Sequence, residues 1–77
     1  MMVHVKVLGA LMKPFGKDDL DFEVPDRANL EALLVSLGYQ QSHLRFIVAS
    51  VNGVQQKLGC ALKDKDEVTL VLPTSGG

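Results

Sequence analysis

The chain has 77 residues, which is enough for one compact domain and too short for two. Hydrophobic residues make up 47% and charged residues 22%, a balance typical of a chain that folds rather than of a disordered one. Eight Lys and Arg against nine Asp and Glu give a net charge of -1, which argues against nucleic acid and anionic membrane surfaces as partners.

Three further features bear on the compartment. Cys60 is the single cysteine, so it has no partner within the chain for a disulfide. The N-terminus lacks the basic start and apolar run of a signal peptide. The longest apolar stretches, 46–51 and 68–72, fall far below the ~20 residues that span a bilayer. We therefore expect a cytoplasmic protein with no membrane segment.

The first third of the chain predicts a β-hairpin. Apolar and other residues alternate over 3–8, with the valines on one side, as in a strand with one buried face. A connection with two glycines and a proline follows, and alternation resumes over 20–24 until Pro25 stops it. We expect these two strands to pair.

A short helix is expected over 30–37. Asn29 can accept a hydrogen bond at its N-terminus, and Gly38 can close its C-terminus in a left-handed conformation. The apolar residues of this segment recur with helical spacing and predict one stripe that packs on a sheet: Leu30, Leu33, Leu34 and Leu37. Residues 39–44 are interpreted as a polar connection.

The remaining strands are expected over 45–51, 54–57 and 67–72, with Asn52-Gly53 forming a two-residue turn between the first two. Shorter turns are expected at 60–62 and 64–66. One helix inserted among these strands predicts an α+β domain with a mixed four- to five-stranded sheet and one main helix across one face. This order matches the ubiquitin-like β-grasp, in which the last strand lies parallel beside the first. The domain is expected over 1–72, followed by a flexible tail, 73–77.

No enzyme motif is present, and the chain lacks room for a deep pocket. His4 and His43 are far apart in the sequence, so a solvated structural role is favoured over metal ligation. Cys60 is interpreted as a small buried residue rather than a nucleophile. An acidic group is interpreted as a solvated face, and no metal site is expected: Asp18, Asp19, Asp21, Glu23 and Asp26.

The C-terminal segment is not explained by folding. Pro73 lacks the N–H that would continue a strand, and Thr74, Ser75, Gly76 and Gly77 follow it. A frayed terminus or a cloning remnant is the simple explanation. Glycines without a Cβ can also pass a narrow channel, as an enzyme requires in order to join a C-terminal carboxylate to AMP.

The sequence resembles the MoaD/ThiS family of sulfur carrier proteins over nearly its whole length. The resemblance is sharpest in three segments that recur together in that family: Val51-Asn52-Gly53, 62–68 and 72–77. It implies a β-grasp fold and a carrier rather than a catalyst. It also implies that an E1-like adenylyltransferase adenylates Gly77 with Mg-ATP, and that a sulfur donor system converts the adenylate to a thiocarboxylate. No cofactor would be bound by the chain itself.

The long first connection and the Pro73 tail look most like the small subunit of molybdopterin synthase, which implies the large subunit as acceptor of the sulfur. Residues 9–16 differ from that type, because they lack its Arg-Glu pair. Carriers for thiamine, tRNA thiolation or amino-acid biosynthesis therefore stay open. So do a ubiquitin-like modifier conjugated to lysines through Gly77 and a non-covalent interaction domain with an incidental tail.

A docking face for partners is expected on the sheet. Alternation sends one set of side chains toward the helix: Val3, Val5, Val7, Ile47, Ala49, Val51, Val68, Leu70 and Leu72. It sends a second set to the opposite side: Leu8, Phe46, Val48, Thr69 and Val71. One short helix cannot cover both faces, and an exposed apolar strip commonly marks a protein interface. A covering loop or a homodimer would be the alternatives.

Overall fold

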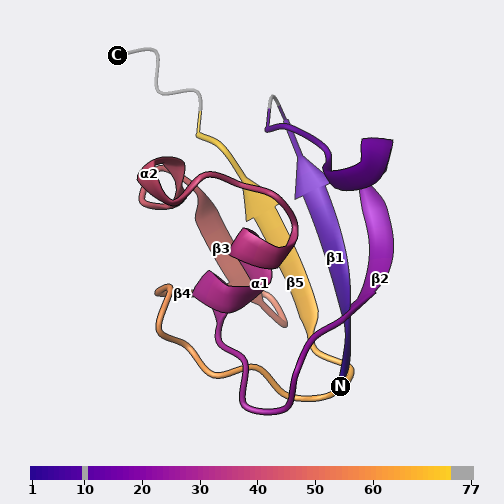
Figure 1. The fold of residues 1–77 in the computed structure, drawn as a ribbon. Helices are drawn as coiled ribbons and strands as arrows, with labels where there is room; N and C mark the ends of the chain where they lie inside the picture. Colours follow the sequence, from indigo (N-terminus) through magenta and orange to yellow (C-terminus); the bar gives the residue numbers. More distant parts are fainter. Residues whose placement is uncertain (10, 74–77) are drawn as a thin grey trace.

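The computed structural model describes residues 1–9 and 11–73. Five strands form one sheet in the order β2-β1-β5-β3-β4 (Figure 1). Their bounds are β1 Met2–Leu8, β2 Asp19–Glu23, β3 Val48–Val51, β4 Val54–Gln56 and β5 Glu67–Val71. β1 and β5 are parallel and the other neighbours are antiparallel, which confirms the predicted mixed sheet and the β-grasp order.

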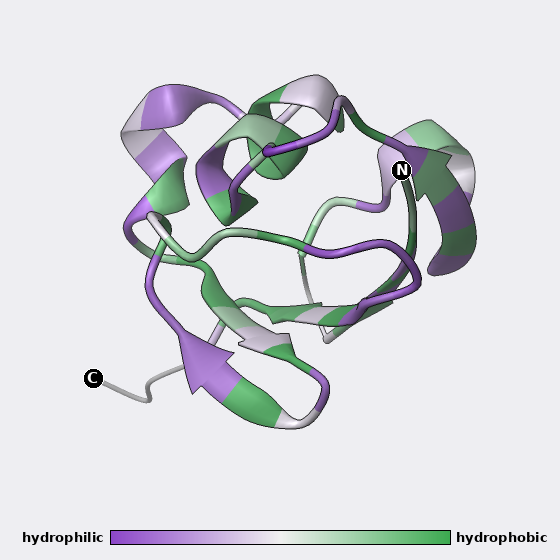
Figure 2. Ribbon diagram, turned by 90° about the horizontal axis from the view of Figure 1, so that it is seen from below, coloured by the Kyte–Doolittle hydropathy of each residue, from purple (hydrophilic) through white to green (hydrophobic). Residues whose placement is uncertain are grey.

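Helix α1, Leu30–Ser36, crosses one face of this sheet, and the short α2, Gln41–Leu44, lies on the same side (Figure 2). Asn29 accepts a hydrogen bond from the N–H of Ala32 at 2.8 Å, as its position predicts. Gly38 has a φ of 101°, the left-handed conformation expected at the helix end. A 3-10 turn over Pro14–Gly16, which the sequence analysis did not anticipate, lies in the first connection.

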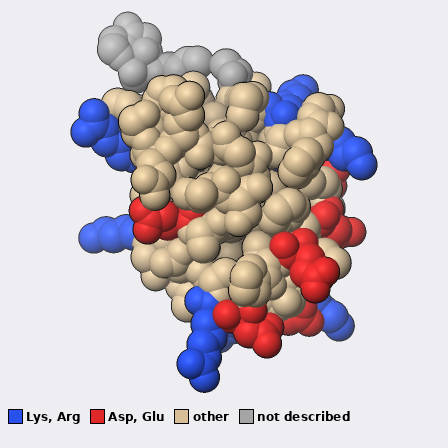
Figure 3. Space-filling view, viewed as in Figure 1, with Lys and Arg blue, Asp and Glu red and all other residues tan. Residues whose placement is uncertain are grey.

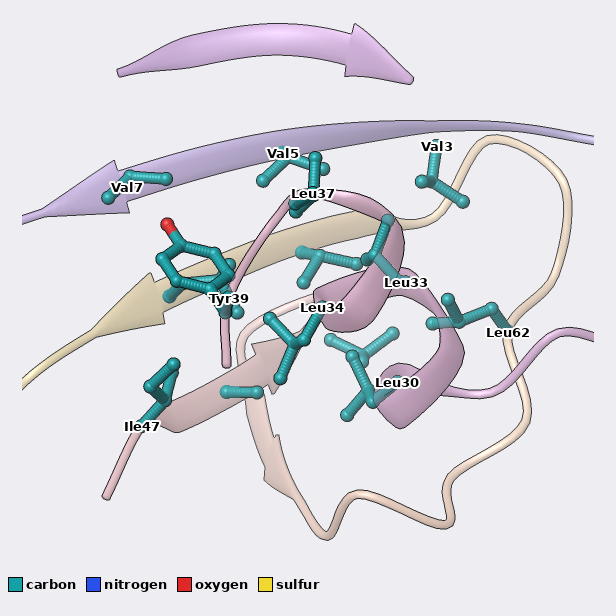
Figure 4. Close-up of a cluster of buried hydrophobic side chains, with 14 of the residues drawn as sticks. Val3, Val5, Val7, Leu30, Leu33, Leu34, Leu37, Tyr39, Ile47 and Leu62 are labelled. Atoms are coloured by element: carbon teal, nitrogen blue, oxygen red, sulfur yellow. The ribbon is translucent and has the colours of Figure 1, made fainter. Parts of the chain in front are cut away.

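The core lies between α1 and the sheet. The leucines of α1 point toward the valines of β1, and both sets are buried (Figure 4). Burying one such side chain contributes roughly 2 kcal/mol, so this contact holds a helix too short to persist alone. The predicted helix-facing set is confirmed, with Leu72 partly buried against the core.

Two predicted segments were wrong. Residues 39–44 are not simply a polar connection, because α2 forms there and both Tyr39 and Leu44 are buried. The third strand begins at Val48 rather than Arg45, because Phe46 and Ile47 bond back to carbonyls of α2 and so continue its turn. Phe46 is therefore exposed as part of a turn and not by alternation along a strand.

Other boundaries shift by one residue. The second strand ends at Glu23 and the last at Val71, and α1 ends at Ser36 with Leu37 as its cap. The expected edge strand is confirmed as β4, and Asn52-Gly53 forms the turn before it with φ values of 53° and 86°.

A hydrogen-bonded pair links this turn to the start of β5. The Asn52 amide donates to the Asp66 carboxylate at 3.0 Å, and its oxygen accepts from the N–H of Glu67 at 3.0 Å. Asp66 also accepts from the N–H of Lys63 at 2.8 Å and is 9% exposed. Buried carboxylates of this kind need such partners, so the pair fixes the position from which β5 runs toward the tail.

Candidate functional site

The sheet face opposite α1 changes character along its strands. Register places Leu8 beside Val71, and Val71 beside Val48, so these three side chains form one apolar row across β1, β5 and β3. The next row, nearer the start of β5, is polar and consists of Lys6, Thr69 and Ser50. The ionisable pair His4 and Glu67 follows it. The apolar row therefore lies at the end of the sheet from which the C-terminal segment leaves.

The structure places all five predicted docking residues at or beside this face. Leu8 is 44% exposed and Phe46 52% exposed. Val48, Thr69 and Val71 are half-buried. Leu8, Val48 and Val71 form the apolar row, Phe46 lies just before β3, and Thr69 belongs to the polar row.

The predicted tail begins at Pro73, which is exposed two residues after β5 ends. Proline cannot donate the N–H that would extend the β1–β5 ladder. Thr74, Ser75, Gly76 and Gly77 lie outside the described residues. The reacting group implied by the sequence is therefore four residues beyond the last described one.

A groove lies beside Pro73, with a volume of about 960 Å³. We call it the tail-root groove. Its lining comes from four separate segments: Leu11 and Met12; Gly38, Tyr39 and Gln40; His43, Arg45, Phe46, Ile47 and Val48; Leu72 and Pro73. The Tyr39 hydroxyl donates to the Met12 carbonyl at 2.6 Å and joins two of these walls. Burial raises the pKa of Tyr39, which keeps this donor protonated.

The groove is not predictable from the sequence. Its residues are scattered from 11 to 73, and no local pattern connects them. The structure leaves two large apolar lining residues outside the helices and strands, Met12 and Phe46, and they are 57% and 52% exposed. Exposed residues of this size mark a surface worth testing for interactions.

His4 is held between two carboxylates of β2. Its Nε2 lies 2.6 Å from Asp19 and its Nδ1 lies 2.8 Å from Asp21, so both ring nitrogens donate when the ring is protonated. The hydrogen bond to Asp21 raises the pKa of His4, against partial desolvation, and the charges of Asp19, Asp21 and Glu67 add to it. His4 was expected to have a solvated structural role, and the structure shows that this role is to link β1 to β2.

This cluster predicts a pH-dependent stability. A raised pKa in the folded state gives stability that is present in full below the unfolded value of about 6.5 and is lost as pH rises through the folded pKa. Urea unfolding should therefore show a lower free energy at pH ~8.5 than at pH ~6. His4→Gln should reduce the difference between the free energies of unfolding at the two pH values. His43→Gln, at an exposed site, is the control and should keep that difference. If His4→Gln lost as much free energy of unfolding between the two pH values as the unmodified chain, the pH dependence could not be assigned to His4.

The structure also places Cys60 and the remaining acidic and histidine side chains. Cys60 is partly exposed rather than buried as expected, because it lies in a loop just before Ala61, which bridges to Asn29, and packs only on the edge of the core. Over residues 1–9 and 11–73, no three His, Cys, Asp or Glu residues are placed to hold a metal ion. In the same part of the chain, no helix is long and apolar enough to cross a membrane.

The sequence model of the ThiS family matches residues 5–77, which is nearly the entire chain. The chain belongs to the ThiS family. The match includes the β-grasp domain, the first connection and the C-terminal glycines. No curated protein sequence matches the chain.

Solved structures show the same fold. The crystal structure of small archaeal modifier protein 1 from Haloferax volcanii has a TM-score of 0.78 at 20% identity, covering 95% of this ThiS-family chain and 98% of that one. The putative molybdopterin converting factor subunit 1 from Pyrococcus furiosus gives 0.76 at 21% identity, with coverages of 95% and 98%. A chain of the complex of subunits 1 and 2 of the molybdopterin-converting factor from Helicobacter pylori gives 0.65 at 25% identity, with both chains fully covered.

Proposed function

We propose that this ThiS-family chain is a sulfur carrier that works through the carboxylate of Gly77. An E1-like adenylyltransferase would use Mg-ATP to join that carboxylate to AMP, with release of pyrophosphate. Hydrosulfide supplied by a donor system would then attack the acyl carbon and displace AMP, which leaves a C-terminal thiocarboxylate without a redox step. The observation that carries the proposal is the family match over 5–77, which extends through the Gly-Gly pair.

The geometry around the tail supports this role. An adenylyltransferase must hold the domain while it draws a thin segment into its active site. The apolar row and Pro73 lie at the same end of the sheet, so contacts on the row would aim residues 73–77 at the enzyme. Anchoring the domain in this way offsets part of the entropy lost when the segment is ordered.

Molybdopterin synthesis is the pathway we propose for the sulfur. The likeness to the Helicobacter pylori and Pyrococcus furiosus subunits supports it. The Helicobacter pylori structure is a complex of subunits 1 and 2, which favours an equivalent large subunit as the acceptor for this chain. A carrier with this chemistry would bind no cofactor itself and would act in the cytoplasm with its partner enzymes.

The second candidate is a ubiquitin-like modifier, favoured by the likeness to small archaeal modifier protein 1. Both candidates share adenylation and differ in the product. The test is incubation with the cognate adenylyltransferase, Mg-ATP and a sulfur donor, followed by an organomercurial gel that retards thiocarboxylates. Retardation supports the carrier. Isopeptide-linked conjugates in cells, with no retarded species, would support the modifier instead.

Val71→Lys tests the docking face. The substitution places a charge in the centre of the apolar row, where a partner would have to desolvate it. We expect binding to the adenylyltransferase to weaken by about 1 to 3 kcal/mol, measured by calorimetry, with little change in thermal unfolding. Gln55→Lys, paired with Ser50 in the polar row, is the matched control and should bind normally. A folded Val71→Lys chain that binds the adenylyltransferase as tightly as the unmodified chain would contradict the docking face.

A further inference from the structure

The tail-root groove has the form of a binding site that the sulfur chemistry does not use. Its inner wall consists of the buried side chains of Leu11, Tyr39 and Ile47, and its rim carries the exposed Met12 and Phe46. A volume of about 960 Å³ is enough for a few side chains of a partner. The hydrogen bond from Tyr39 to Met12 fixes two walls, so the groove exists before anything binds.

The charge of the groove is one-sided. Its ionisable lining residues besides Tyr39 are His43 and Arg45, and no Asp or Glu of the described residues contributes to it. The Arg45 guanidinium lies 4.9 Å from the centre of the Phe46 ring and stacks on the rim. Within residues 1–9 and 11–73, no carboxylate lies within 4.0 Å of it. This arginine can therefore pair with a carboxylate brought by a ligand.

The rest of the surface contrasts with this end. On the face drawn in Figure 3, most acidic side chains lie in the lower and right-hand parts, with one further group at the left edge at mid-height, whereas uncharged and basic side chains surround the end from which the C-terminal segment leaves. The paired carboxylates Asp19 and Asp21 lie on β2, at the far edge of the sheet from β3. A ligand carboxylate therefore meets basic side chains at the groove lining, while the Asp19 and Asp21 carboxylates lie at the other edge of the sheet.

We propose that the tail-root groove binds a peptide segment of the enzyme that receives the tail, in which an apolar side chain is flanked by carboxylates. This inference rests on the proposed function for the identity of the partner. Phe46 and Val48 belong both to the groove and to the predicted docking set, so a protein that covers the apolar row reaches the groove without a break. The apolar side chain fills the groove, and a carboxylate pairs with Arg45.

The test uses the whole chain and three labelled pentapeptides: Asp-Glu-Phe-Leu-Asp, its basic counterpart Lys-Arg-Phe-Leu-Lys, and Asp-Glu-Ser-Ser-Asp. Fluorescence anisotropy gives the affinities, and amide chemical shifts identify the site. We expect the first peptide to bind about tenfold more tightly than either other one, with chemical-shift changes confined to the groove and an affinity that falls with salt.

Two charge reversals locate the interaction. Arg45→Glu should reverse the preference between acidic and basic peptides. Lys57→Glu, an exposed charge reversal away from the groove lining, should leave it unchanged.

Equal affinity for acidic and basic peptides, or equal effects of Arg45→Glu and Lys57→Glu, would overturn the proposal. So would concentration-dependent dimerisation that competes with the peptide, because the groove would then hold a second copy of the chain. These measurements need neither ATP nor an activating enzyme. Their failure therefore leaves the carrier function standing, while failure to form a thiocarboxylate would not change the peptide affinities.

Discussion

Deleting Gly77 is expected to reduce adenylation by the cognate enzyme to background and to leave the unfolding transition of the domain unchanged. The proposed reaction takes place at that carboxylate, and a chain ending at Gly76 would present its carboxylate one residue short, about 3.5 Å from the required position. ATP–pyrophosphate exchange measures the first step directly. Leu72 is the last of the described residues that packs against the core, and Gly77 lies five positions further along the chain, so we expect urea unfolding not to register the deletion.

Two further variants make this result specific. Adding one alanine after Gly77 should abolish exchange in the same way, because the carboxylate is displaced in the opposite direction. Ser75→Ala changes the same segment without moving its end and should retain exchange. If the extended chain were adenylated normally, the enzyme would not require the carboxylate at the position of Gly77, and the reacting position assigned here would be wrong.

Asp66→Ala is expected to destabilise the fold by about 3 kcal/mol. The change removes two hydrogen bonds to a nearly buried carboxylate, each of which contributes about 1.5 kcal/mol or more, and leaves the Asn52 amide and the Lys63 N–H without their partner. Urea unfolding measures the loss. Asp18→Ala is the control, because its exposed carboxylate is 3.9 Å from Lys13 and should contribute within about 0.5 kcal/mol. Equal effects of the two variants would contradict the role assigned to Asp66.

The same pair joins two of the segments on which the family resemblance rests. Asn52 lies in the first recurring segment and Asp66 in the second, and each needs the other to complete its hydrogen bonds. In this chain the pair therefore anchors the start of β5. The sequence showed both residues, but 14 positions separate them and local patterns do not identify such pairs.

Strand faces were predictable where a strand is flanked on both sides. β1 lies between β2 and β5 under α1, so Val3, Val5 and Val7 must all be buried and alternation is strict. The segment before β3 was not predictable, because α2 has only four residues and depends on the burial of Leu44. Helices this short have little propensity of their own, so tertiary packing decides them.

The candidate site also has one part that the sequence predicts and one part that it does not. The apolar row could be predicted, because its members follow strand periodicity and pair across neighbouring strands. The tail-root groove could not, because its walls meet only after the sheet brings Leu72 near Tyr39 and Phe46. The restriction of the apolar character to one end of the face also depended on register, which places Lys6 beside Thr69 and His4 beside Glu67.

The most direct measurement of the central claim is the intact mass of the chain before and after incubation with its adenylyltransferase, Mg-ATP and a sulfur donor. The account predicts an increase equal to the replacement of one oxygen by sulfur, confined to the C-terminal peptide and absent when Gly77 is deleted. An unchanged mass, obtained with an enzyme that adenylates the chain and a donor that sulfurates a known carrier, would contradict the proposal that this protein carries sulfur.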